Sequence, residues 1–141
     1  MLIGTYRHSV DAKKRMRVPS KFKSELGSNF ILTKGTDGNL FAFSSEKFAD
    51  LYEKLTNLPI FDEEAQKPVR KFLASAFEAE EDGQGRVLLP NELVKFANID
   101  KNIVFIGVGN RVEIWAEEAW DKREQEEDEG EKFSVLAKFG V

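Results

Sequence analysis

The chain repeats one short sequence pattern, and this repeat constrains its fold more than any other feature. Asp11-Ala-Lys-Lys-Arg15-Met-Arg-Val-Pro19 is matched later by Asp82-Gly-Gln-Gly-Arg86-Val-Leu-Leu-Pro90. The apolar segments 30–33 and 40–43, which follow the first copy, also have counterparts after the second. Self-similarity of this kind indicates one supersecondary unit used twice. We therefore expect two related half-domains.

Each copy predicts the same order of elements: a strand, a polar corner, a short strand, a short helix, a hairpin and a longer helix. Proline ends the short strand in both copies, because it cannot donate to a strand ladder. Gly27 is an expected helix stop, and the expected N-caps are Ser20, Ser44 and Asn91. The expected strands are 6–10, 15–18, 30–33 and 40–43 in the first copy, and 77–81, 86–89, 103–108 and 111–115 in the second.

The pattern divides the chain into four segments. Residues 1–57 form the first repeat, 58–75 a helical linker, 76–127 the second repeat and 128–141 a C-terminal tail. Pro68 is expected to kink or restart the linker helix, because proline removes a hydrogen bond from a helix interior. A repeat of this size is close to the lower limit for burying its own core. We therefore expect the repeats to pair or the chain to oligomerise.

The composition is that of a folded protein, with 41% hydrophobic residues and no cysteine. The lack of cysteine excludes disulfides and thiolate metal sites, and it is compatible with a reducing cytoplasm. No apolar run in the sequence reaches the length of a membrane span, and the first residues lack the pattern of a signal peptide. We therefore expect no membrane partner.

The net charge of −4 hides an uneven distribution along the chain. Residues 1–35 carry many lysines and arginines against Asp11 and Glu25, whereas residues 113–132 are mainly acidic. A basic lobe is the place where a polyanion would bind. The acidic run 124–131 fits a solvated helix face or tail, which would repel DNA and help to orient the rest of the protein.

The repeated Asp-x-x-x-Arg pattern lies at an expected strand-to-strand corner. An aspartate in a turn accepts hydrogen bonds from nearby backbone amides. We expect Asp11 and Asp82 to fix their corners in this way, as structural partners of Arg15 and Arg86. The arginine can also project its planar fork of donors outward.

The chain resembles the MraZ family through the segments 10–19, 79–90 and 112–115. The resemblance implies an α+β, β-rich fold of two tandem AbrB/SpoVT-like half-domains, which form a swapped-hairpin small β-barrel flanked by helices. It also implies ring-shaped homo-oligomers that bind double-stranded DNA at repeated promoter boxes of their own division and cell-wall gene cluster, in the cytoplasm at the nucleoid. Repression of that cluster is carried by the resemblance alone.

The two copies differ at the position before the motif arginine, where the first has Lys14 and the second Gly85. Glycine adopts positive φ readily and lysine only at a cost, so a different backbone shape is expected in the first corner. Lys14 also adds charge to the first corner, whereas Arg86 follows a run of acidic residues. We therefore expect the first copy to grip DNA and Arg86 to be mainly structural or to contact a ring neighbour.

The candidate DNA-binding residues follow from this division. Lys13, Lys14 and Arg17 are expected to contact phosphates and to supply salt-dependent affinity. Arg15 is the candidate for a base edge, where a bidentate contact to guanine contributes about 1–3 kcal/mol of discrimination. Arg86 completes the set as the arginine of the second motif.

An enzyme is the first alternative, and the sequence disfavours it. His8 is the only histidine. The chain contains neither a catalytic triad nor a phosphate-binding glycine loop. No catalytic residue, metal site or cofactor is therefore expected.

A protein-binding module of antitoxin or scaffold type is the stronger alternative. The acidic segment beyond Trp120 could recruit a basic partner. Apolar residues of the tail are expected to dock on the protein's own surface or on a ring neighbour: Phe133, Val135, Leu136 and Phe139.

Overall fold

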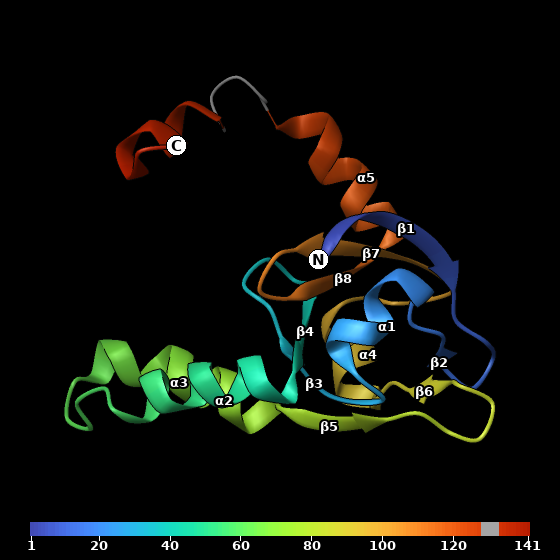
Figure 1. The fold of residues 1–141 in the computed structure, drawn as a ribbon, viewed down its shortest axis with the longest axis horizontal. Coiled ribbons are helices and arrows are strands. Elements are labelled where there is room, and N and C mark those ends of the chain that lie inside the picture. Colours follow the sequence, from blue (N-terminus) through green and yellow to red (C-terminus); the bar gives the residue numbers. More distant parts are fainter. Residues whose placement is uncertain (128–132) are drawn as a thin grey trace.

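The structure is a computed structural model, and it describes residues 1–127 and 133–141 (Figure 1). The strands are β1 (Ile3–Ser9), β2 (Arg15–Met16), β3 (Asn29–Lys34), β4 (Leu40–Ser44), β5 (Phe77–Glu80), β6 (Val87–Leu88), β7 (Asn102–Val108) and β8 (Val112–Ala116). The helices are α1 (Ser20–Leu26), α2 (Ser45–Thr56), α3 (Glu63–Ser75), α4 (Asn91–Phe96) and α5 (Glu117–Glu126), with a 3₁₀ helix η1 (Val135–Phe139). Within the described residues, every helix is too short or too polar to span a membrane.

The two repeats are interwoven rather than side by side. A six-stranded antiparallel sheet has the order β1-β7-β8-β4-β3-β5, and β2 pairs with β6 in a separate ribbon. The first strand of each repeat thus adds to the hairpin of the other: β1 pairs with β7, and β5 pairs with β3. The order of elements predicted from the sequence is confirmed, and the exchange of strands joins both repeats in one sheet.

An approximate two-fold relation links the repeats. Phe41 and Glu113 occupy equivalent positions in the repeated sequence, and they face each other where β4 pairs with β8. Met16 and Val87 are also equivalent, and they face each other in the β2–β6 ribbon. The approximate two-fold axis therefore passes through the β4–β8 pairing and the β2–β6 pairing. The two corners consequently lie next to the same ribbon.

The core lies between the curved sheet, the ribbon and the short helices α1 and α4 (Figure 1). Phe22 from α1 and Leu93 from α4 are almost fully buried in a core to which both repeats contribute. Full burial of a large apolar side chain contributes about 1.5–3 kcal/mol. Other members of this core are Met16, Phe30, Leu32, Leu40, Val87, Ile103, Phe105 and Ile114. Neither repeat can bury these residues without the other.

The helices α2 and α3 form a hairpin that projects from one end of the sheet (Figure 1). Pro68 lies inside a continuous α3, so the predicted restart is wrong, and the predicted kink stays a prediction. The hydrogen bond that proline removes would end on the carbonyl of Glu64, which is exposed and can bond to water. Thr33 of β3 ties the far end of α3 to the sheet, because its hydroxyl lies 2.8 Å from Ser75 Oγ.

Helix caps agree only in part with the sequence prediction. Ser44 caps α2 as predicted, since its Oγ accepts a hydrogen bond from the Lys47 amide at 3.2 Å. Gly27 also ends α1 as predicted. Ser20 and Asn91 are instead the first helical residues, after the N-caps Pro19 and Pro90, which provide no side-chain bond. The extended backbone of each proline turns the chain into its helix.

The α+β class with two repeats is confirmed, but no closed barrel is detected among the described residues. Among the described residues, the one β-bridge that joins the ribbon to the main sheet is the isolated bridge between Glu81 and Val87. Both ribbon strands are two residues long, because Pro19 and Pro90 follow closely. Strands this short leave the ribbon as a separate layer.

Candidate nucleic-acid interface

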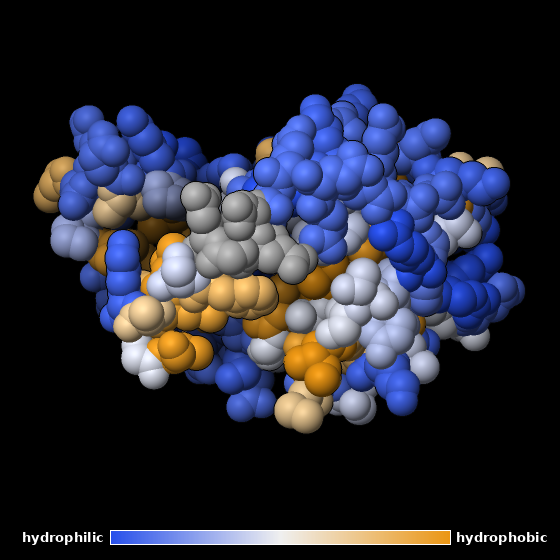
Figure 2. All heavy atoms as spheres, turned by 90° about the horizontal axis from the view of Figure 1, so that it is seen from above, coloured by the Kyte–Doolittle hydropathy of each residue, from blue (hydrophilic) through white to orange (hydrophobic). Residues whose placement is uncertain are grey.

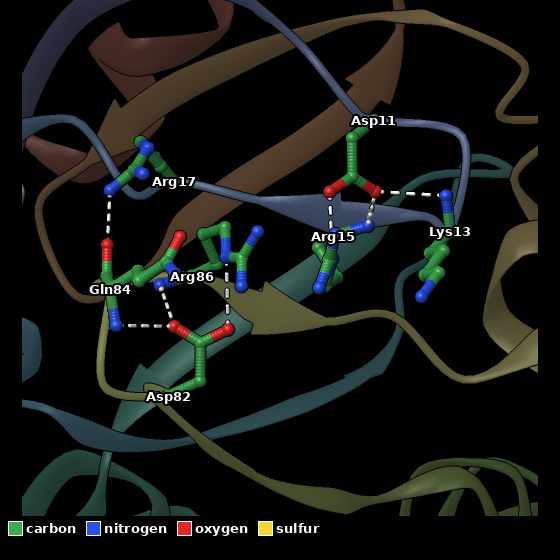
Figure 3. A network of polar contacts seen from close by, with 7 residues as sticks. All are labelled: Asp11, Lys13, Arg15, Arg17, Asp82, Gln84 and Arg86. Atoms are coloured by element: carbon green, nitrogen blue, oxygen red, sulfur yellow. Dashed lines mark hydrogen bonds and ion pairs between the residues drawn. The ribbon is translucent and has the colours of Figure 1, made fainter.

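The two motif corners lie side by side and use the same set of hydrogen bonds (Figure 3). In the first, Asp11 Oδ1 accepts from the backbone amides of Lys13 and Arg15, each at 2.9 Å, and Asp11 Oδ2 accepts from Arg15 Nε at 2.7 Å. In the second, Asp82 Oδ1 accepts from the amides of Gln84 at 2.8 Å and Arg86 at 2.9 Å. Arg86 Nε donates to Asp82 Oδ2 at 3.0 Å.

The backbone shape of the corners is also the same, so the expectation of a different first corner is wrong. Lys14 has φ of 60°, and Gly85 has φ of 76°. Each amide donates to the carbonyl of its aspartate at 3.0 Å. A lysine in this region costs about 1 kcal/mol relative to glycine. The aspartate bonds on either side hold Lys14 in the left-handed region.

The aspartates hold the arginines by one nitrogen and leave the rest of each guanidinium available. Arg15 and Arg86 are partly exposed, and within residues 1–127 and 133–141 their Nη groups have no hydrogen-bond partner. Hydrogen bonds from the Arg15 amide, followed by the Arg15 and Lys13 contacts, lower the pKa of Asp11. The Arg86 amide likewise lowers the pKa of Asp82. Both carboxylates are therefore ionised at neutral pH.

An open depression of about 440 Å³ connects the corners. Its lining residues are His8, Ser9, Val10, Asp11, Arg15, Arg17 and Arg86. His8 Nδ1 donates to the carbonyl of Arg17 at 2.9 Å, since a carbonyl can only accept. The depression therefore brings arginines of both repeats to one face, which suits an extended anion better than a small buried ligand.

The remaining predicted cations lie in different surroundings. The side chain of Lys13 is exposed at the tip of the first corner. Lys14 Nζ donates to the backbone carbonyl of Asp100 and lies 3.9 Å from its carboxylate. Arg17 is exposed, and its Nη1 donates to the carbonyl of Gln84 in the second corner (Figure 3). Arg17 of the first repeat therefore places its positive charge at the corner of the second repeat.

Lys23 is a residue of this surface that the sequence analysis missed. Its Nζ lies 3.3 Å from the Glu81 carboxylate, beside the second corner. A Cβ atom placed on Gly85 would lie 3.5 Å from both Lys23 Nζ and Arg17 Nη1. The acidic residues before Arg86 are therefore offset by cations from the first repeat. No local pattern signals this, because residues 23 and 85 meet only through the interwoven fold.

A second open depression, of about 600 Å³, lies between α5 and the loop before β7. Its lining is polar and mixed in charge, and Arg7 pairs with Asp121 at 2.8 Å nearby. In the part of the chain that the structure describes, no group of three or more His, Cys, Asp or Glu could hold a metal ion. This depression therefore offers neither a metal site nor a basic surface.

A known protein family contains the repeated unit that carries these corners. A family model described as "MraZ protein, putative antitoxin-like" matches residues 1–71 and again residues 72–137. The chain belongs to the MraZ family. The two matches correspond to the two repeats, so each corner lies in one copy of the MraZ unit.

Relatives in the MraZ family are similar over most of their length. A protein named transcriptional regulator MraZ from Caldanaerobacter subterraneus subsp. tengcongensis is 45% identical, over 91% of this chain and 90% of the relative. One with the same name from Acetivibrio thermocellus is 46% identical, over 96% of this chain and 99% of the relative. A third, from Caldicellulosiruptor bescii, is 51% identical over 86% of this chain and 85% of its own.

Proposed function

We propose that the chain is a DNA-binding transcriptional regulator without enzymatic activity. The observation that supports this most directly is the pair of Asp–Arg corners, which direct two fixed guanidinium groups to one open basic face. Guanidinium groups recognise phosphates and guanine edges in a bidentate way. The names of the relatives, transcriptional regulator MraZ, point to the same function.

In the proposed mechanism, Lys13, Lys14 and Arg17 contact phosphates, and Arg15 reads a base edge. Lys13 is free to reach a phosphate, and Arg17 and Lys14 have exposed or partly exposed side chains. Asp11 holds Arg15 through Nε, so less side-chain entropy is lost when its Nη groups bind. Phosphate contacts set the affinity and its salt dependence, and the base contact sets the sequence.

Arg86 has the same pre-organised geometry, but it lies among more acidic neighbours. We propose that it contributes less to DNA affinity than Arg15 does. Its main role is then to fix the second corner or to contact a neighbouring subunit. Arg17 and Lys23 offset the negative charge around Arg86, which allows Arg86 a secondary contact with DNA. The experiment therefore compares Arg15 and Arg86 directly.

One corner pair is small for a specific protein–DNA interface, which supports action as an oligomer. We propose a ring-shaped homo-oligomer that engages repeated boxes in the promoter of its own division and cell-wall gene cluster, at the nucleoid. Several linked contacts raise the affinity through effective concentration. Occupation of the promoter would then repress transcription by steric exclusion.

The test is fluorescence anisotropy with a duplex from upstream of this protein's own gene and a shuffled duplex, across a salt series. Wild type is compared with Arg15→Ala, Arg86→Ala and, as a matched control, Lys47→Ala on the exposed face of α2. We expect wild type and Lys47→Ala to prefer the native duplex, and Arg15→Ala to lose the preference. Arg86→Ala should have the smaller effect.

Equal and weak binding of wild type to both duplexes would contradict the proposal. A larger loss in Arg86→Ala than in Arg15→Ala, with an unchanged oligomer, would reverse the proposed division between the corners.

A protein-binding module of antitoxin or scaffold type is the second candidate, and α5 supports it. The helix presents exposed acidic side chains, including Glu118, Glu124 and Glu126, to which a basic partner could bind. The acidic run 124–131 continues into residues outside the described part of the chain. This candidate gains support if the anisotropy series shows no preference for the native duplex.

A further inference from the structure

Two surfaces of the molecule expose apolar side chains that the DNA-binding face does not use. The first, the hairpin tip, is the loop between α2 and α3 with Leu58, Ile60 and Phe61, where Phe61 is 96% exposed. The second, the tail segment, is residues 133–141, where Phe139 is 76% exposed. Figure 2 shows apolar side chains at the surface in the half of the molecule that holds α2, α3 and the tail segment, and others towards its middle.

The α2–α3 hairpin is poorly covered by the rest of its own chain. Both helices are amphipathic, yet α2 buries no residue fully and α3 buries only Val69 and Ser75. Tyr52 of α2 is exposed, and Leu55 is half-buried. Helices of 12 and 13 residues are marginal in water without tertiary packing. The hairpin therefore leaves apolar side chains uncovered near its tip.

The tail segment also exposes an apolar face, which can pack against the apolar side chains of the hairpin tip. Leu136 and Phe139 of η1 are spaced by three residues, so they share one face of this 3₁₀ helix, and Phe133 lies two residues before its start. All three are exposed, so among the described residues this apolar face has no seat on its own chain. A short helix with one apolar face is a common ligand for an apolar surface between helices.

We propose that the tail segment of one copy docks on the hairpin tip of a second copy. Each chain carries both halves of the contact, so no other protein is needed. Charge supports the choice of partner, since Lys138 beside Phe139 is exposed and Glu63, two residues after Phe61, is exposed. Among the described residues, neither of these side chains has an ion-pair partner. The lysine of the tail segment would then face an acidic residue beside the hairpin tip.

The contact joins two different surfaces, so it is heterologous. A heterologous contact repeated from copy to copy closes into a ring when the rotation allows and otherwise gives an open filament. The segments involved are short compared with a standard interface of roughly 20–30 residues a side. One contact alone is therefore weak, and closure stabilises it because every subunit then makes two.

This inference rests on the self-association included in the proposed function and names the surfaces that carry it. It is independent of the DNA contact, because neither surface contains a corner residue. Assembly in this way leaves the two corners of each subunit free. The corners and the assembly surfaces can therefore be tested separately.

The test uses two full-length variants, Phe61→Glu at the tip and Phe139→Glu in the tail. Both side chains are well exposed, so the folded chain should tolerate each change. By sedimentation velocity, we expect wild type to be a closed oligomer and each variant to be a monomer. An equimolar mixture should form a heterodimer and nothing larger, because one intact tail then meets one intact tip.

Ile3→Glu is the matched control, since it places the same charge at a 60% exposed apolar residue on β1. It should keep the wild-type mass. The proposal is overturned if either single variant keeps the wild-type mass, or if the mixture remains monomeric even at concentrations far above those at which wild type assembles. A fall in melting temperature without a change in mass would show that the tail docks on its own chain.

Anisotropy on the same variants separates this proposal from the proposed function. The monomeric variants should bind a duplex with a single box as wild type does, and they should lose the gain from tandem boxes. If wild type binds no DNA selectively but the mass results hold, only the DNA-binding proposal fails.

Discussion

Arg17 of the first repeat donates a hydrogen bond from Nη1 to the carbonyl of Gln84 in the second. The relation is not reciprocal, because the equivalent of Arg17 in the second repeat is Leu88. Lys23 approaches the same corner and pairs with Glu81 at 3.3 Å. The first repeat thus supplies positive charge to both corners, and the basic face belongs to the interwoven pair rather than to one motif.

Replacement of Gly85 by lysine should strengthen DNA binding. Gly85 has φ of 76°, and the equivalent Lys14 already tolerates φ of 60°. A Cβ atom there would meet only side-chain nitrogens at 3.5 Å, which is ordinary contact. Each added phosphate contact should steepen the salt dependence of log K by about one unit. Gly85→Asn is the uncharged control, and equal anisotropy curves for both variants would contradict the prediction.

Replacement of Lys14 by glycine should change stability and DNA affinity in opposite directions. Relief of the positive φ should add about 0.5–1 kcal/mol to the free energy of unfolding. Loss of the exposed contact with Asp100 should remove about 0–1 kcal/mol. We expect stability in urea to be unchanged or slightly higher, while DNA affinity falls. A clear loss of stability would show that the Asp100 contact outweighs the backbone strain.

Acid should weaken the folded state partly through the two corners. Hydrogen bonds lower the folded-state pKa of Asp11 and Asp82 below the unfolded value of about 3.9. Their stabilising effect is therefore complete above pH 4 and is lost as pH falls through the folded-state pKa. Melting temperatures between pH 7 and 3 should fall less for Asp11→Asn than for wild type. Asp50→Asn, on exposed α2, should retain the wild-type profile.

Neither repeat should fold as a monomer when it is separated from the other. A fragment of residues 1–71 lacks β7, which pairs with β1, and β5, which pairs with β3. A fragment of residues 72–141 lacks the reciprocal partners. Circular dichroism should show no cooperative thermal transition for either fragment at low concentration, and an equimolar mixture should recover one. A folded monomeric fragment would show that strand exchange is not required.

Several local features could be predicted because neighbouring residues decide them. The alternation of apolar segments, turns and prolines gave the order of strands and helices in both repeats. The Ser44 cap and the Gly27 stop depend on atoms a few residues apart. The contact between Asp11 and Arg15 is of the same kind, since four residues separate them across a tight turn.

Other features could not be predicted, because they depend on partners far along the chain or on balances of energy. Lys14 adopts positive φ because two aspartate hydrogen bonds outweigh a strain of about 1 kcal/mol. Pro68 stays inside α3 because that helix is held to the sheet, for example where Ser75 meets Thr33. The conformational propensities of lysine and proline alone predict neither the positive φ of Lys14 nor the place of Pro68 inside a helix.

The sequence by itself determined that one supersecondary unit is used twice, and that each copy has an Asp–Arg corner. Only the tertiary structure decided that β1 joins β7 and β5 joins β3, and hence that Arg17 and Lys23 lie at the second corner. The physical reason is that the hydrogen bonds of a turn depend only on residues that are close together in the sequence. Strand partners are chosen instead by the burial of a shared core, to which side chains from the whole chain contribute.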